Sequence, residues 1–168
     1  MKSILRLILV IFISTGLFFG AHQYMIHESQ HLSSKVLADF GVDAEGNFTK
    51  PEPNYPNYVC TQAKNLDRFV APIDTSAWKR DDLEIVRLMR DTLMNFINNK
   101  VIEDKGDYLH IAITTPLNLI DDVEVFYDEA THMIHFRSAC RVGYFDFGIN
   151  KNRYKSFKES LLMRLEIQ

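Results

Sequence analysis

The chain has 168 residues, of which 46% are hydrophobic and 24% are charged, and its formal net charge is −3. This composition suits one folded domain with short additions and argues against intrinsic disorder. Because a nucleic-acid-binding surface would need a basic face, the negative charge leads us to expect no nucleic acid as a partner.

An apolar segment lies near the start of the chain, from Ile4 to Ala21, and Arg6 is its only charged residue. As a helix that rises ~1.5 Å per residue it would be ~27 Å long, just short of the ~30 Å hydrocarbon core of a bilayer. Lys2 and Arg6 precede the apolar run, which by the positive-inside rule keeps the N-terminus in the cytoplasm. We therefore predict an inner-membrane signal anchor over residues 1–21, with the rest of the chain on the periplasmic side.

Removal of this segment as a signal peptide is the alternative. Cleavage needs small residues just before the cut, whereas Phe18 and Phe19 crowd the plausible site near Gly20 and Ala21. This favours the uncleaved anchor, and cleavage would instead give a secreted or periplasmic protein.

The next segment, residues 22–58, is predicted to connect the anchor to a folded domain over residues 59–168. Residues 22–40 could continue the first helix, and residues 41–58 hold three of the five prolines, which is typical of an extended linker. His27 and His31 could share a helical face with Glu28 and bind a metal ion. No fuller metal signature accompanies them, so we expect no metal.

In the remaining sequence, the spacing of the apolar residues predicts an α+β fold. Apolar residues recur at helical spacing over 81–99 and again over about 150–165. Residues 108–114, 119–128 and 133–142 alternate with a period of two, as antiparallel strands do when one face is buried. Shorter strands are expected at residues 68–72 and 100–104. We predict an antiparallel sheet of about four to five strands with two helices packed on one face.

The alternation also gathers polar side chains on one side of the sheet. If the hairpin between the last two strands is centred between Ala130 and Thr131, Glu124 lies opposite Arg137. The predicted patch consists of His110, Asp122, Glu124, His135, Arg137 and Arg141. Two arginines could bind a carboxylate or phosphate. The alternative is a ladder of cross-strand ion pairs on a solvated face, which is ordinary for antiparallel sheets.

Catalytic signatures are missing from the sequence, since it has no nucleophile elbow, phosphate-binding loop, dinucleotide fingerprint or zinc-protease helix. His110 or His135 could act with Asp122 in acid–base chemistry. Ser138 is predicted to point into the core. We expect no cofactor and favour a role other than catalysis.

Three stretches resemble motifs of a known family. Residues 56–63 read PNYVCTQA, residues 121–126 read DDVEVF, and residues 137–144 read RSACRVGY. These are similar to the motifs of the bacterial and plastid family of unknown function DUF1499, and the resemblance extends over roughly residues 51–165. The family implies no settled activity. Tyr144, which ends the last motif, completes our set of candidate ligand-binding residues.

The two cysteines depart from the family's motifs, because Cys60 and Cys140 stand where the motifs usually have serine. An exported domain meets an oxidising compartment, so we hypothesise a disulfide between them. Closing a loop of this size could add up to ~4 kcal/mol of stability. Two separate buried thiols are the alternative.

These features together predict a membrane-tethered domain of the cell envelope that binds a partner protein or a small anionic ligand. The alternatives are a hydrolase-like enzyme that uses His110 or His135, and a purely structural tether.

Overall fold

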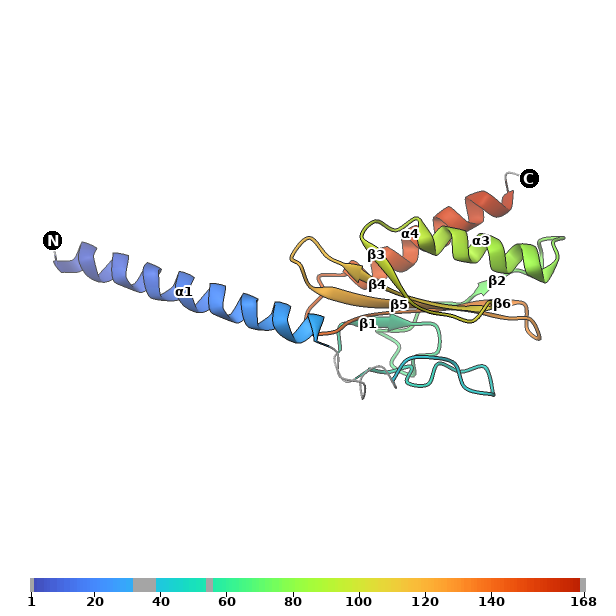
Figure 1. The fold of residues 1–168 in the computed structure, drawn as a ribbon, viewed down its shortest axis with the longest axis horizontal. Helices are drawn as coiled ribbons and strands as arrows, with labels where there is room; N and C mark the ends of the chain where they lie inside the picture. Colours follow the sequence, from blue (N-terminus) through green and yellow to red (C-terminus); the bar gives the residue numbers. More distant parts are fainter. Residues whose placement is uncertain (1, 32–38, 54–55, 167–168) are drawn as a thin grey trace.

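The computed structural model describes residues 2–31, 39–53 and 56–166. Its first element is the helix α1 (Lys2–Gln30), which projects away from the rest of the chain (Figure 1). The stretch Arg6–Gln30 is long and apolar enough to cross a membrane, and its apolar window is not buried by the rest of the molecule. The hydroxyls of Ser14 and Thr15 donate to the carbonyl of Ile11 at 2.9 and 3.0 Å, so neither is left unsatisfied within the apolar run. The rest of the predicted helical extension, residues 32–38, lies outside the described residues.

Within the described residues, six strands form one antiparallel sheet. Five of them follow the spatial order β1 (Tyr58–Cys60), β6 (Met133–Cys140), β5 (Ile120–Asp128), β4 (Tyr108–Thr114) and β3 (Asn99–Asp104). The two-residue strand β2 (Ile73–Asp74) also pairs with β6. The predicted hairpin register is confirmed, because Glu124 pairs with Arg137 across β5 and β6.

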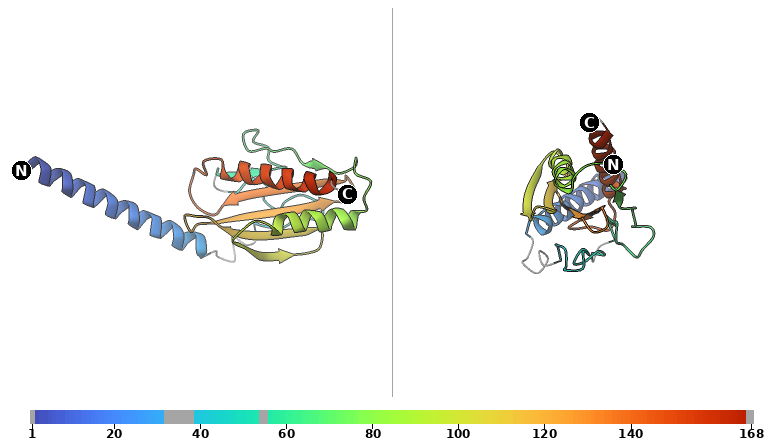
Figure 2. Two further views of the ribbon diagram at one scale, coloured as in Figure 1. Left: turned by 90° about the horizontal axis from the view of Figure 1, so that it is seen from above. Right: turned by 90° about the vertical axis from the view of Figure 1, so that its right-hand side faces the viewer.

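Two helices, α3 (Asp82–Met94) and α4 (Ile149–Glu166), cover one face of the sheet (Figures 1 and 2). Apolar side chains from both layers form the main core. They include Leu109, Ile111, Val123, Val125 and Phe136 from the strands, and Met89, Leu93, Phe157 and Leu161 from the helices. Each fully buried apolar side chain stabilises the fold by ~1.5–3 kcal/mol relative to exposure. The predicted α+β fold with two helices on one face is therefore confirmed.

Some predicted boundaries were wrong. The helix expected over residues 81–99 ends at Met94, whose carbonyl accepts a hydrogen bond of 3.0 Å from the Asn99 side chain. Ile97, which lies within the predicted helical range but beyond the end of α3, is consequently 80% exposed. The strand expected at residues 68–72 is not formed either. Proline has no N–H for a ladder, and pairing with β6 begins only after Pro72, at Ile73.

Asp81 caps the first turn of α3, where its carboxylate accepts a hydrogen bond of 2.7 Å from the backbone N–H of Glu84. Asp81→Ala is expected to lower the free energy of unfolding by about 1 kcal/mol, because that N–H loses its partner. Urea unfolding measures the change. Asp91→Ala, on the exposed side of the same helix, should change stability by less than about 0.5 kcal/mol, and equal effects would contradict the capping role.

The opposite face of the sheet is covered by chain from residues 39–50, part of the predicted linker. Phe48 is 2% exposed and packs in a second apolar cluster with Tyr58, Cys60 and Tyr108. An isolated bridge between Val42 and Phe48 closes this segment into a loop. The predicted linker therefore packs on the sheet, and this packing decides what surrounds the polar side chains on that face.

Candidate functional site

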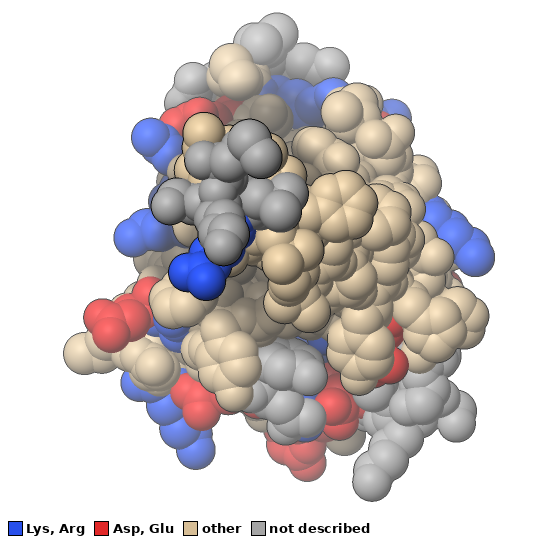
Figure 3. All heavy atoms as spheres, turned by 90° about the vertical axis from the view of Figure 1, so that its left-hand side faces the viewer, with Lys and Arg blue, Asp and Glu red and all other residues tan. Residues whose placement is uncertain are grey.

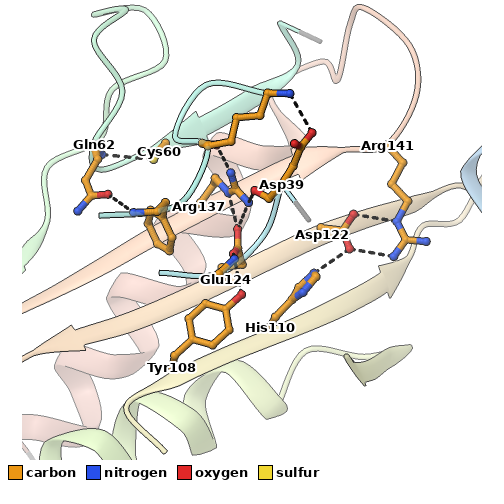
Figure 4. A network of polar contacts seen from close by, with 12 residues as sticks. Asp39, Cys60, Gln62, Tyr108, His110, Asp122, Glu124, Arg137 and Arg141 are labelled. Carbon is orange, nitrogen blue, oxygen red and sulfur yellow. Dashed lines mark hydrogen bonds and ion pairs between the residues drawn. The ribbon is translucent and has the colours of Figure 1, made fainter. Parts of the chain in front are cut away.

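Strand alternation places the predicted polar residues on the face opposite the helices. Tyr108 and His110 come from β4, Asp122 and Glu124 from β5, and Arg137 from β6 (Figure 4). They form two groups of contacts, one around Glu124 and one around Asp122.

The first group centres on the carboxylate of Glu124, which forms an ion pair with Arg137. Tyr108 donates its hydroxyl to Glu124 at 2.7 Å, and the backbone N–H of Gly41 donates at 2.9 Å. The Arg137 guanidinium also donates to the carbonyls of Lys50 and Asp39. This arginine therefore joins the sheet to the covering segment.

Aromatic rings enclose the same guanidinium. Its central carbon lies 4.8 Å from the ring centroid of Phe40 and 5.5 Å from that of Phe48. A cation over an aromatic face is attracted by the ring quadrupole, and the attraction grows when water is excluded. Phe40 and Phe48 thus provide both cover and a favourable electrostatic surface for Arg137.

The second group centres on Asp122. Arg141 donates to both of its oxygens, each at 2.8 Å, and His110 Nε2 lies 2.9 Å from one of them. Burial by itself would raise the pKa of Asp122, but the hydrogen bonds from Arg141 and then His110 outweigh it and hold the pKa below its ordinary value. Arg141 also donates to the carbonyl of Ser29, at the end of α1, at 3.1 Å.

The depth of these groups decides between the two interpretations of the polar face. Arg137, Glu124, His110 and Asp122 are each no more than 2% exposed. The face is therefore not a solvated ion-pair ladder. It is not an open anion site either, since carboxylates and backbone carbonyls already occupy the arginine donors.

His110 and Asp122 have the geometry of an acid–base pair, but solvent does not reach the histidine ring. Its ring stacks on Phe40 with the centroids 4.5 Å apart, and the side chain is almost fully buried. A substrate could reach this histidine only if Phe40 and the covering segment moved. The arrangement suits a structural role better than catalysis.

Two members of the predicted set lie elsewhere. His135 is half-buried, its Nδ1 lies 3.2 Å from the hydroxyl of Thr61, and burial lowers its pKa. Tyr144 is 68% exposed in the loop after β6. The structure thus brings together five of the seven predicted ligand-binding residues.

A second polar cluster, on the helix face, escaped the sequence analysis. Arg153 of α4 forms an ion pair with Asp121 at 2.7 Å and donates to the Ser138 hydroxyl, also at 2.7 Å. Ser138 points into the core as predicted. The period-two pattern of residues 119–128 could have indicated this cluster. It places Asp121 on the same buried face as Val123, and a carboxylate in a core needs a cationic partner.

The two cysteines are free thiols in the structure and are not brought together. Cys60 belongs to the cluster under the covering segment, whereas strand alternation turns Cys140 to the helix face, where Asn150 Nδ2 donates to its sulfur at 3.3 Å. Burial raises the pKa of both thiols, that of Cys60 to about 11.

The described part of the chain contains no group of three or more His, Cys, Asp or Glu side chains placed to hold a metal ion. His27 and His31 stack on each other, with ring centroids 4.2 Å apart.

The end of the sheet next to α1 is unusually apolar. His22 Nε2 donates to the carbonyl of Leu117 at 3.1 Å, which joins the helix to the loop between β4 and β5. Leu117 and Phe145 line one cavity beside Met25 of α1, and they are 62% and 83% exposed. Figure 3 views the molecule from the side on which α1 leaves the domain, and uncharged residues, those of α1 included, fill the middle of this view. Large exposed apolar side chains gathered in one place mark a contact surface.

The comparisons with known proteins can now be set beside this geometry. No curated protein and no solved structure matches the chain. The family model described as "Protein of unknown function (DUF1499)" matches residues 49–161, which include the sheet, α3 and most of α4. The chain therefore belongs to the DUF1499 family, and its apolar helix α1 precedes the region that the family model matches.

Proposed function

We propose that this chain is a single-pass protein of the inner membrane whose domain lies on the periplasmic side and acts by binding a partner at the membrane surface. Lys2 and Arg6 before the apolar run support this orientation. The observation that carries the proposal is that the exposed apolar side chains of Leu117 and Phe145 lie beside Met25 of α1, where the helix meets the domain.

The junction between α1 and the domain supports a fixed orientation. Contacts of His22 with Leu117 and of Arg141 with Ser29 join the end of the helix to two different loops. A domain held in this way presents the same loops to the bilayer at all times. Apolar and aromatic side chains at such a position contribute by entering the region between headgroups and acyl chains.

Arg137 and Arg141 fit this proposal as parts of the junction. Arg137 donates to the carbonyls of Asp39 and Lys50, and Arg141 donates to that of Ser29. They hold the chain that follows the anchor against the sheet. A small anionic ligand would have to displace these contacts, so we favour a partner that meets the exposed apolar end. We accordingly keep residues 1–21 as the anchor and group residues 39–50 with the folded domain.

Localisation of a C-terminally tagged full chain tests the proposal. Cells are fractionated, protease is added from the periplasmic side, and the mass of the mature protein is measured. We expect a full-length, membrane-bound chain. Its domain should be digested once the outer membrane has been permeabilised, while the inner membrane is still intact.

The control is an inner-membrane protein whose soluble domain lies in the cytoplasm. This domain stays undigested unless the protease leaks through the inner membrane. A chain shortened near Ala21 and recovered in the soluble periplasmic fraction would contradict the anchor. A full-length chain digested only after the inner membrane is broken would contradict the orientation.

A further inference from the structure

A cavity of about 290 Å³ lies at the membrane-proximal end of the domain, between α1 and the loops that follow β4 and β6. Its apolar lining includes Met25, Leu117, Leu119, Ile120, Val142 and Phe145. Residues from three separate parts of the chain therefore meet around it. A closed apolar cavity of only about 150 Å³ holds benzene, so this one has room for a segment of a hydrocarbon chain.

The polar groups of the lining are already paired within the protein. Asp121 forms an ion pair with Arg153, and Asp146 accepts hydrogen bonds from the backbone N–H groups of Gly148 and Asn150. The latter bonds cap the start of α4. With these carboxylates occupied, the cavity offers its ligand mainly hydrocarbon surface, which selects an apolar ligand over a charged one.

The position of the cavity along α1 identifies the source of such a ligand. The last residue of the uninterrupted apolar run is Ala21, and Met25 follows four residues later, which is ~6 Å along a helix. The headgroup region on each side of a bilayer is ~5–8 Å thick. If α1 spans the membrane, the cavity lies at headgroup depth, directly beside the acyl chains.

We infer that this cavity binds the acyl chain of a bilayer phospholipid, an inference that rests on the proposed membrane-facing orientation. Leu117 and Phe145 line the cavity and are themselves 62% and 83% exposed, so an acyl chain that reaches them from the bilayer meets apolar surface before it enters. The partner at the membrane surface is then, at least in part, lipid.

Photo-crosslinking from the lipid tests the inference. The full chain is reconstituted into phosphatidylcholine vesicles that contain a phosphatidylcholine with a diazirine near the end of one acyl chain. After irradiation, tandem mass spectrometry maps the modified residues. We expect adducts on Ile120 and Cys140 inside the cavity as well as on α1. Leu83, which is 80% exposed in the first turn of α3, at the far end of the sheet, is the internal control and should carry none.

A cavity-filling substitution separates binding inside the cavity from contact at its mouth. Val142→Trp places an indole in the cavity, and the adducts on Ile120 and Cys140 should fall about tenfold, the effect of excluding about two methylene groups from an apolar site. Adducts on α1 should be unchanged. Leu119→Trp repeats the test from another wall, and circular dichroism identifies any variant that fails to fold.

Each outcome has a distinct meaning. Adducts on Leu117 and Phe145 without any on Ile120 or Cys140 would overturn the cavity site and leave the membrane-facing orientation standing. Adducts confined to α1 would overturn both. Adducts on Ile120 and Cys140 that persist in both tryptophan variants would also overturn the inference, because they would not depend on the cavity.

Discussion

Arg137→Met should lower the free energy of unfolding by about 3–5 kcal/mol, the usual cost of removing one partner from a buried ion pair. Glu124 would keep its hydrogen bonds from Tyr108 and Gly41 but lose its cationic partner, while both side chains of the pair are at most 2% exposed. Methionine retains much of the apolar stem, so packing changes little. Loss of the bonds to the carbonyls of Asp39 and Lys50 should also loosen the covering segment.

Urea unfolding of the full chain in mild detergent measures this effect. The single tryptophan, Trp78, is a suitable reporter because it packs against the main core. Arg87→Met is the matched control, since Arg87 is an exposed arginine of α3 and should change stability by less than about 0.5 kcal/mol. The double variant Arg137→Met, Glu124→Leu should be more stable than Arg137→Met alone, because it leaves no unpaired buried charge. A loss below about 1 kcal/mol for Arg137→Met would contradict the role assigned to the pair.

Asp122→Asn should destabilise the domain by about 3 kcal/mol or more at neutral pH, because Arg141 would lose its carboxylate partner. The same substitution should alter the pH dependence of stability. The pKa of Asp122 in the folded protein lies below its ordinary value, whereas an unfolded aspartate titrates near about 3.9. The ionised group therefore stabilises the fold above about pH 4. That contribution is lost as the pH falls through the folded pKa.

The free energy of unfolding measured between neutral and strongly acidic pH tests this second expectation. Wild type should lose stability steeply in acid, and Asp122→Asn should lose less over the same range. Asp91→Asn, on the exposed side of α3, is the control and should follow the wild-type curve. If Asp122→Asn showed the same acid dependence as wild type, Asp122 would not be the coupled group.

Local patterns were sufficient to predict most of the sheet and both covering helices. The period-two alternation of residues 108–114 matches β4 residue for residue, and the polar turn at 129–132 set the register of β5 and β6. Both features depend on interactions between neighbours in the sequence or directly across a hairpin. The helix boundaries were less certain, because Ile97 continues the apolar stripe although the chain has already left the helix.

The surroundings of the polar face could not be predicted in the same way. The alternation of side chains along the strands predicts that Glu124 and Arg137 share a face, but it does not predict whether water or protein covers them. The segment over residues 39–50 is rich in small and polar residues and was assigned to a linker. It packs on the sheet because Phe40 and Phe48 enclose the Arg137 guanidinium, and Gly41 donates its N–H to Glu124. These contacts join residues more than 80 positions apart in the sequence.

The sequence by itself thus determined the apolar helix, the family, the α+β class and the pairing of Glu124 with Arg137, because each depends on a local pattern or a contiguous motif. Only the tertiary structure decided that Arg137 is buried, that Cys60 and Cys140 face opposite sides of the sheet, and that the apolar loops gather beside α1. The physical reason is that the burial of a side chain depends on which distant segment packs on its face of the sheet. The local spacing of apolar residues does not predict that packing.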